Sequence, residues 1–254
     1  MVFIHGIGRS LEDFAGTQDD LSTDFDTIAF DLPGSGWSSR SDEQLGLQVL
    51  ARAVREILDA LKVTEPAHLV GNSLGGAVAM TVAANESPRV RSMTLVDSAG
   101  FGRDVTLSLR LLAVRPVGAA LLRPSVSNAT RVTREMFGDR SLVTPELVAH
   151  AYRLSQRPDF ARSLLDVASD LGTFWGVRSR WRRHLLSTVS AMTLPTLIVW
   201  GSADVVLPPK HLRAAMAALP QSQGHVFEGA GHMPQIERRA EFSTMLRNFL
   251  DEQQ

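Results

Sequence analysis

Short, uninterrupted apolar runs alternate with helical patterns along most of this chain, and this alternation limits its fold more than any other feature. The runs predict strands at residues 2–4, 27–31, 67–70, 93–97, 196–200 and 225–227. Apolar positions at three- and four-residue spacing predict helices at residues 47–61, 74–85, 208–219 and 239–250. Strands that are apolar throughout are buried on both faces, which is typical of parallel strands joined by helices. We therefore predict an α/β fold with a mostly parallel central sheet flanked by helices.

Residues 101–190 differ from the rest of the chain. They contain helical patterns at residues 125–137 and 159–171, but no convincing strand. A third helix is predicted to begin at Thr144 and Pro145, because threonine at the N-cap followed by proline is a frequent helix start. We predict that residues 101–190 form a helical cap inserted into an α/β core made of residues 1–100 and 191–254.

The predicted cap is basic. It holds 14 arginines, no lysine and 7 acidic residues, a formal charge of +7 that leaves −8 for the rest of the chain. Four of the arginines form a run, Arg178, Arg180, Arg182 and Arg183. Arginine binds carboxylates through paired hydrogen bonds, so a negatively charged substrate is one hypothesis. The alternative is that these side chains are only solvated.

Composition excludes several classes of function. The formal net charge of −1 gives no reason to expect nucleic acid as a partner. No apolar run approaches the roughly 20 residues that cross a bilayer, and no signal peptide precedes the first strand, so we predict a cytoplasmic protein. The absence of cysteine excludes disulfides, thiolate metal sites and a cysteine nucleophile.

Small residues surround one serine in the stretch 69–78, which reads LVGNSLGGAV. Glycines are common wherever a strand turns tightly into a helix, so an ordinary connection would account for them. The stretch also matches the G-x-S-x-G pattern of a nucleophile elbow, in which a serine occupies a strained turn and its neighbours must be small. The pentapeptide alone leaves both interpretations open.

Polar residues follow the predicted strands at their carboxyl ends, where open parallel sheets bind ligands. They are His5, Asp31, Ser73, Asp97, Asp204 and His232. A serine hydroxyl needs a base to become a nucleophile, and the base needs a carboxylate to fix its tautomer. The chain order Ser73, Asp204, His232 is one known arrangement of such a triad. Asp97 is an alternative acid, although the adjacency of the last two strands favours Asp204.

These features together resemble the α/β-hydrolase fold family, in its cap-bearing branch of esterases and C–C bond hydrolases. The resemblance covers nearly the full length through residues 5–6 (HG), 31–36 (DLPGSG), 71–76 (GNSLGG), 201–204 (GSAD) and 231–232 (GH). It implies Ser73 as nucleophile, His232 as general base and Asp204 as the acid that orients it. It also implies an oxyanion hole formed by the backbone N–H groups of Leu74 and Ile7. No cofactor or metal is expected, and the implied partner is a small-molecule ester-type substrate.

The chain departs from the family pattern in two ways. The strand that leads to His5 is normally preceded by a hairpin, and here it begins at residue 2. Either the chain is a shortened form or its sheet lacks this edge hairpin. In the usual strand order, strand 27–31 is then expected at the sheet edge. Asn72 before the serine resembles C–C bond hydrolases of ring-fission products, but Arg9 and Met233 stand where those enzymes carry proline and tryptophan. The sequence thus predicts hydrolysis of a carboxylic ester, thioester or lactone. C–C bond hydrolysis is the alternative, and a ligand receptor without turnover is a second one.

Overall fold

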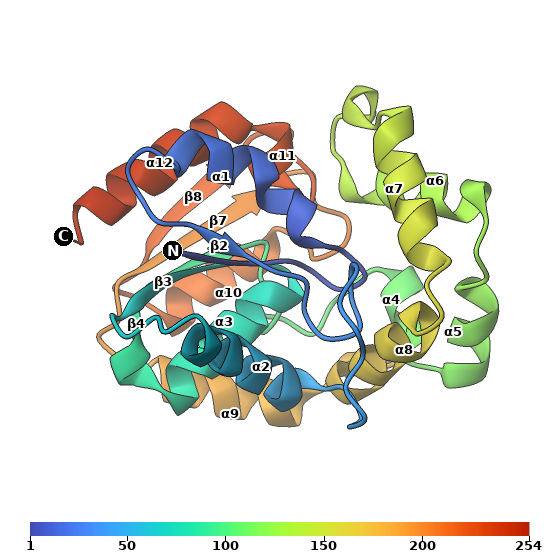
Figure 1. Ribbon diagram of the computed structural model, residues 1–254, viewed down its shortest axis with the longest axis horizontal. Coiled ribbons are helices and arrows are strands. Elements are labelled where there is room, and N and C mark those ends of the chain that lie inside the picture. Colours follow the sequence, from blue (N-terminus) through green and yellow to red (C-terminus); the bar gives the residue numbers. More distant parts are fainter. Residues whose placement is uncertain (254) are drawn as a thin grey trace.

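A computed structural model describes residues 1–253 and contains a six-stranded sheet in the order β2-β1-β3-β4-β7-β8. Every neighbouring pair in this sheet is parallel, so the predicted α/β architecture is confirmed (Figure 1). The strands are β1 (Val2–Ile4), β2 (Ile28–Ala29), β3 (Ala67–Asn72), β4 (Val90–Val96), β7 (Thr196–Gly201) and β8 (Gln223–Phe227). No strand pairs with the free side of β2 among the described residues.

Alternate strand residues bury themselves in two separate cores, one on each face of the sheet. Ile4, Leu69 and Ile198 belong to one apolar cluster, whereas their neighbours Val70 and Val199 belong to the other. This alternation explains why the strands read as continuous apolar runs. The first cluster is covered by α2 (Leu47–Ala60), α3 (Leu74–Asn85), α9 (Ser179–Val189) and α10 (Lys210–Ala218), and the second by α1 (Ala15–Leu21) and α12 (Arg239–Asp251).

The edge strand β2 is shorter than the stretch 27–31 that predicted it. Beyond Ala29 the chain leaves the sheet, because its polar groups bind neighbouring loops. The carboxylate of Asp31 accepts hydrogen bonds from the backbone N–H groups of Leu11 (2.8 Å) and Trp37 (2.7 Å). The Leu32 N–H donates to Nε2 of His5 at 3.0 Å. These bonds fix the loops at the carboxyl end of the sheet.

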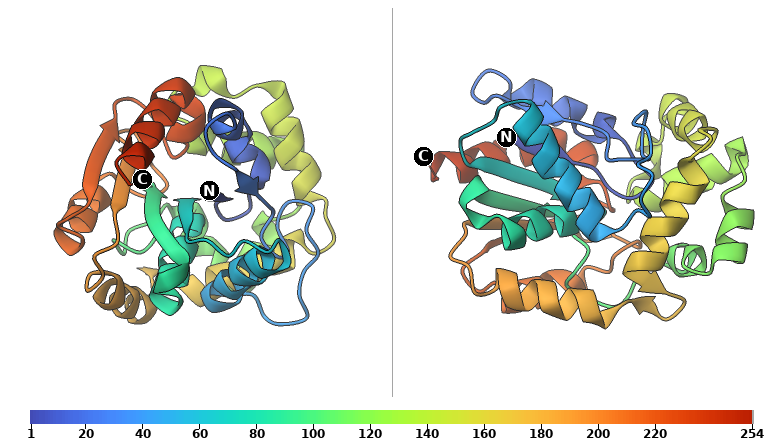
Figure 2. Two further views of the ribbon diagram at one scale, coloured as in Figure 1. Left: turned by 60° about the vertical axis from the view of Figure 1, so that its left-hand side comes forward. Right: turned by 60° about the horizontal axis from the view of Figure 1, so that its bottom comes forward.

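Between β4 and β7 the chain forms a group of helices that lies beyond the carboxyl ends of the strands (Figure 2). They are α4 (Leu107–Leu112), α5 (Arg115–Leu121), α6 (Val126–Met136), α7 (Pro145–Ser155) and α8 (Phe160–Leu171). Thr144 caps α7 by accepting from the Leu147 N–H, as the sequence predicts. The helix α9 also falls within residues 101–190, but it packs against α3 beside the sheet. The division into core and cap at residues 101 and 190 stays a prediction.

The expectation that residues 101–190 contain no strand is wrong in one place. A two-stranded hairpin joins β5 (Gly172–Thr173) to β6 (Gly176–Val177) directly after α8. Two residues per strand are too few to produce a recognisable sequence period. Gly176 has φ of +105°, which a side chain rarely adopts, so this glycine marks the turn.

Three short 3₁₀ helices and one short α-helix complete the fold: η1 (Leu11–Phe14), η2 (Ser87–Arg89), η3 (Arg140–Leu142) and α11 (Pro234–Glu237). Within residues 1–253, none of the helices has both the length and the apolar character needed to cross a membrane.

Candidate active site

Ser73 occupies a strained turn between β3 and α3. Its φ of +55° and ψ of −114° lie in a region that non-glycine residues rarely adopt and that costs free energy to maintain. The backbone holds this turn on both sides: Ser73 N–H donates to Val96 O at 2.9 Å, and Ser73 O accepts from Ala99 N–H at 3.0 Å. A Cβ on Gly75 would lie 2.0 Å from the carbonyl oxygen of Ile4. The small residues in stretch 69–78 are therefore required by the close approach of helix and strand.

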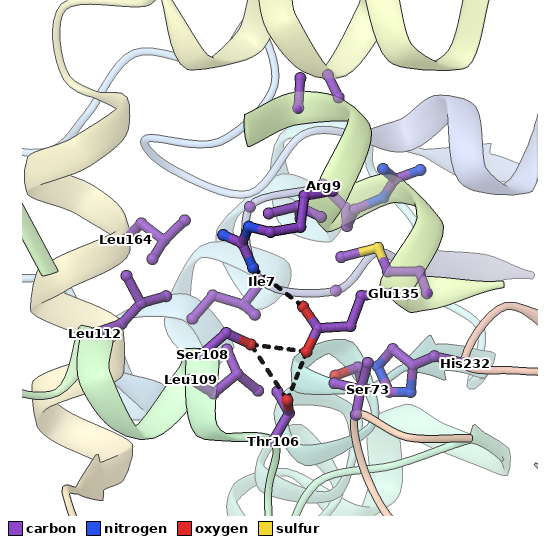
Figure 3. A pocket seen from close by; sticks show the side chains of 18 of the residues that line it. Ile7, Arg9, Ser73, Thr106, Ser108, Leu109, Leu112, Glu135, Leu164 and His232 are labelled. Atoms are coloured by element: carbon purple, nitrogen blue, oxygen red, sulfur yellow. Dashed lines mark hydrogen bonds and ion pairs between the residues drawn. The ribbon is translucent and has the colours of Figure 1, made fainter. Parts of the chain in front are cut away.

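Asp204 and His232 meet because they follow adjacent parallel strands, β7 and β8. Nδ1 of His232 lies 2.8 Å from Oδ2 of Asp204, and both side chains are buried. The other oxygen of Asp204 accepts from the backbone N–H groups of Val206 (2.7 Å) and Leu207 (3.0 Å). The carboxylate therefore has three donors, which stabilise its ionised form and fix its direction. Ser73 and His232 line the same cavity, where Figure 3 shows them side by side.

Asp97, the alternative acid, is also buried in this region but does not bond to His232. Its Oδ1 accepts from the backbone N–H of Gly201 at 2.9 Å, and its Oδ2 has no hydrogen-bond partner. Burial, and then the nearby carboxylate of Asp204, raise the pKa of Asp97 well above its usual value. Of these two carboxyl groups, only that of Asp204 bonds to the imidazole of His232.

The backbone N–H groups of Ile7 and Leu74 are available beside Ser73. Within residues 1–253 neither N–H donates to another group of the chain. Ile7 lies on the loop after β1, and Leu74 is the first residue of α3, where N–H groups have no partner inside the helix. Both residues line a small cavity that Ser73 also lines.

His5 anchors the loop that carries Ile7. Its Nε2 accepts from Leu32 N–H at 3.0 Å, so the proton of the neutral ring lies on Nδ1, which donates to Gly6 O at 2.8 Å. Protonation of Nε2 would remove the bond to Leu32. Burial accordingly lowers the pKa of His5 below its usual value.

We expect this histidine to make the protein less stable in acid. Its pKa is lower in the folded than in the unfolded state, so the unfolded state takes up the proton first as the pH falls below about 6.5. The free energy of unfolding should then fall by up to about 1.4 kcal/mol per pH unit from this group. Urea unfolding of the wild type and His5→Gln across about pH 5–7 tests this. The free energy of unfolding should fall less steeply with decreasing pH in the variant than in the wild type. Equal slopes of this free energy against pH in both proteins would contradict the role assigned to His5.

Glu237 joins two loops near His232, and the sequence does not predict this contact. Its carboxylate accepts from Gly231 N–H at 2.7 Å, next to His232, and from Gly138 N–H at 2.9 Å, just after α6. One side chain thus joins the loop of the histidine to the helices beyond the sheet. Nothing in the sequence distinguishes this glutamate from others on helix ends. Its partners are backbone N–H groups, which carry no sequence signal, and Gly138 lies 99 residues away along the chain.

The main cavity beside Ser73 has a volume of about 130 Å³ and lies between the sheet end and the helices α4 to α8. Its lining is mostly apolar and includes Leu109, Leu112, Leu122, Val132, Phe160 and Leu164. One polar cluster around Glu135 interrupts this lining (Figure 3). Oε1 of Glu135 accepts from the hydroxyls of Thr106 (2.5 Å) and Ser108 (3.0 Å), and Oε2 lies 3.5 Å from the guanidinium of Arg131.

The arginines that line this cavity are all paired with acids. Arg9 is buried and makes a bidentate ion pair with Asp13, in which Nε donates to Oδ2 of Asp13 at 2.9 Å and Nη2 donates to Oδ1. Arg131 pairs with Glu135. The run of four arginines in the sequence, Arg178 to Arg183, lies on or just before α9 and lines neither of the cavities that Ser73 lines. The hypothesis that this run binds the substrate thus finds no support in the geometry.

Comparison with known proteins identifies the family. The sequence model of the family described as alpha/beta hydrolase fold matches residues 1–239 of this chain. This chain belongs to the α/β-hydrolase family. The resemblance to this family that the motifs indicate is therefore confirmed. The relatives that are named as hydrolases support hydrolase activity.

The similar proteins include both C–C bond hydrolases and an esterase. The chain is 32% identical over 259 residues to 2-hydroxymuconate semialdehyde hydrolase of a Pseudomonas strain, covering 99% of this chain and 87% of that protein. A meta-cleavage product hydrolase from Pseudomonas fluorescens matches with a TM-score of 0.82 and 29% identity over 100% of this chain and 90% of the other. A thermophilic esterase from Thermogutta terrifontis matches with a TM-score of 0.80 over 99% of this chain and 89% of the other, and at 22% identity it shows the fold alone.

Proposed function

We propose that the protein is a serine hydrolase that cleaves a carboxylic ester, thioester or lactone through an acyl-enzyme. The observation that carries this proposal is the 2.8 Å contact between Asp204 and Nδ1 of His232, beside a serine held at positive φ. A carboxylate on Nδ1 leaves Nε2 as the nitrogen that accepts a proton. No metal or organic cofactor has a role in this mechanism.

In the proposed mechanism Ser73 attacks the carbonyl carbon of the substrate while Nε2 of His232 takes the hydroxyl proton. The negative charge on the carbonyl oxygen is stabilised by the N–H groups of Ile7 and Leu74. His232 then protonates the leaving alcohol, and Asp204 stabilises the imidazolium between these steps. A water molecule activated by His232 hydrolyses the acyl-enzyme in the reverse sequence and restores Ser73.

The polar groups of the main cavity favour a neutral ester over a substrate with a carboxylate. One relative of this kind, from Comamonas testosteroni, acts on dicarboxylates, as its name states: 2-hydroxy-6-oxononadienedioate/2-hydroxy-6-oxononatrienedioate hydrolase. In this chain the cavity presents the carboxylate of Glu135, and the guanidinium of Arg9 is already bound by Asp13. A second carboxylate would meet like charge and no unpaired arginine.

We expect the wild type to hydrolyse a neutral acyl ester about 10-fold or more faster, in kcat/KM, than the same ester with a terminal carboxylate. Glu135→Gln removes the negative charge while keeping an acceptor for Thr106 and Ser108, so it should narrow this ratio. Arg180→Gln is the matched control, since that side chain lies on α9 away from the cavity, and it should leave the ratio unchanged. A wild-type preference for the carboxylate substrate would contradict the argument.

C–C bond hydrolysis remains the second candidate, because Asn72 precedes the serine and the relative at 32% identity carries that activity. Nδ2 of Asn72, however, donates to the backbone carbonyls of Val96 (3.2 Å) and His232 (3.1 Å), so this amide supports the fold of the site. A screen of activated esters, thioesters, lactones and vinylogous diketones separates the two candidates. A single burst without steady turnover on every substrate would instead favour a ligand receptor.

A further inference from the structure

Asp97 is a buried carboxyl group near the proposed triad, and the mechanism leaves its place there unexplained. It follows β4 with φ of +44°, and none of its surface is exposed. Its backbone N–H donates to Val199 O at 3.0 Å and its Oδ1 accepts from Gly201 N–H, so β7 holds the residue firmly. Its Oδ2 is buried without any hydrogen-bond partner, which is costly for a charged oxygen.

The carboxyl group of Asp97 lies close to the acid of the proposed triad. One carboxylate oxygen of Asp97, one carboxylate oxygen of Asp204 and one ring nitrogen of His232 all lie within 4.8 Å of one another. Asp204 accepts from three donors, whereas Asp97 accepts from one. Within residues 1–253, no lysine or arginine forms an ion pair with either carboxyl group. Two adjacent buried carboxylates cannot both be ionised at low cost, so one proton belongs to the pair. The three donors on Asp204 stabilise its charge and leave the proton to Asp97.

We propose that Asp97 is a neutral carboxylic acid whose Oδ2–H donates a hydrogen bond to the carboxylate of Asp204. In this arrangement every buried oxygen of the two groups is satisfied: Oδ1 of Asp97 accepts from Gly201, and its proton is the fourth donor to Asp204. Asp97 is then a positioning residue, which holds the carboxylate toward His232 and keeps a single negative charge beside the imidazole. The catalytic part of this inference rests on the proposed function, and the protonation state does not.

The charged groups that face Asp97 agree with this assignment. Asp204, on the loop after β7, and His232 both lie close to it, and Glu237 of α11 adds a further negative charge. Acidic neighbours and burial both raise the pKa of Asp97, with burial the larger cause. The pKa of Glu237 is also raised by burial, so a measurement must separate the two carboxyl groups.

Infrared spectroscopy tests the protonation state without any substrate. The wild type at about pH 7, where exposed carboxyl groups are ionised, should show the C=O stretch of a protonated buried carboxyl group that shifts in D₂O. Asp97→Asn should remove this band, and Glu237→Gln is the control that should leave it. A difference spectrum between wild type and Asp97→Asn without such a band would overturn the proposal, whatever the enzyme hydrolyses.

Kinetics test the positioning role. Asp97→Ala removes the donor and should lower kcat about 10-fold with little change in KM, whereas Asp97→Asn supplies an N–H donor of similar shape and should restore most of the loss. The acid limb of kcat/KM in Asp97→Asn should stay at the wild-type pH, because a neutral group replaces a neutral group. A downward movement of that limb by about one pH unit would show that Asp97 is ionised and supports the imidazolium, which would overturn the proposal. If Asp97→Ala does not fold, Asp97→Asn and the infrared band decide alone.

Discussion

Replacing Ser73 by alanine should lower kcat for an activated ester by about 10⁴-fold or more, with KM nearly unchanged. The variant loses the only oxygen that can form the acyl-enzyme, while the cavity, the N–H groups of Ile7 and Leu74 and the Asp204–His232 pair remain. A stopped-flow assay should also show that the burst of alcohol release disappears, because the burst reports acylation of the serine.

The fold of this variant is expected to stay intact, because alanine is smaller than serine and Ser73 uses only its backbone groups to hold the turn. Thermal unfolding should confirm this. Ser187→Ala, on the exposed side of α9, is a control that should keep full activity. Turnover by Ser73→Ala at the wild-type rate would remove Ser73 from the mechanism.

Replacing Asp204 by asparagine should lower kcat by about 10⁴-fold as well. The amide of asparagine can place its N–H toward Nδ1 of His232, which would then hold its proton on Nε2 and lose its function as a base. The bonds from Val206 and Leu207 can be kept by the amide oxygen, so stability should change much less than activity. Steady-state kinetics together with thermal unfolding measure both effects.

The comparison with Asp97→Asn makes this prediction specific. Asp204 contacts the imidazole directly and Asp97 does not, so the asparagine variant at 204 should be far more impaired. A folded Asp97→Asn protein without turnover, beside an active Asp204→Asn protein, would transfer the role of the acid to Asp97.

The sequence predicts the sheet and its flanking helices well, because here one physical cause dominates. Strand residues such as Val70 and Val199 are buried on one face while their neighbours are buried on the other, and this produces apolar runs that are visible without a structure. Helix α3 begins and ends at the predicted residues. Its start is visible in the sequence because Gly71, before the turn, and Gly75, in the first turn of the helix, leave no space for a side chain. The length of strand β2 is overestimated, because the side chain of Asp31 binds the backbone of loops that the local sequence does not show.

Long-range polar contacts are the part of the site that sequence reasoning misses. Glu135 on α6 meets Thr106 and Ser108, at the start of α4, only in the folded chain, so no spacing in the sequence predicts this polar cluster. The pairing of Arg9 with Asp13 has a four-residue spacing that could have indicated it. The sequence leaves the choice between Asp97 and Asp204 to an argument about adjacent strands, and the structure adds the bond that distinguishes them.

Labelling with a serine-directed phosphonate tests the central proposal most directly. The phosphonate should add one group per chain, and peptide mass spectrometry should place that group on Ser73. Esterase activity should fall in proportion to the label, and Ser73→Ala should take up none. A phosphonate bound to another residue, or complete labelling of Ser73 with ester turnover undiminished, would contradict the proposed mechanism.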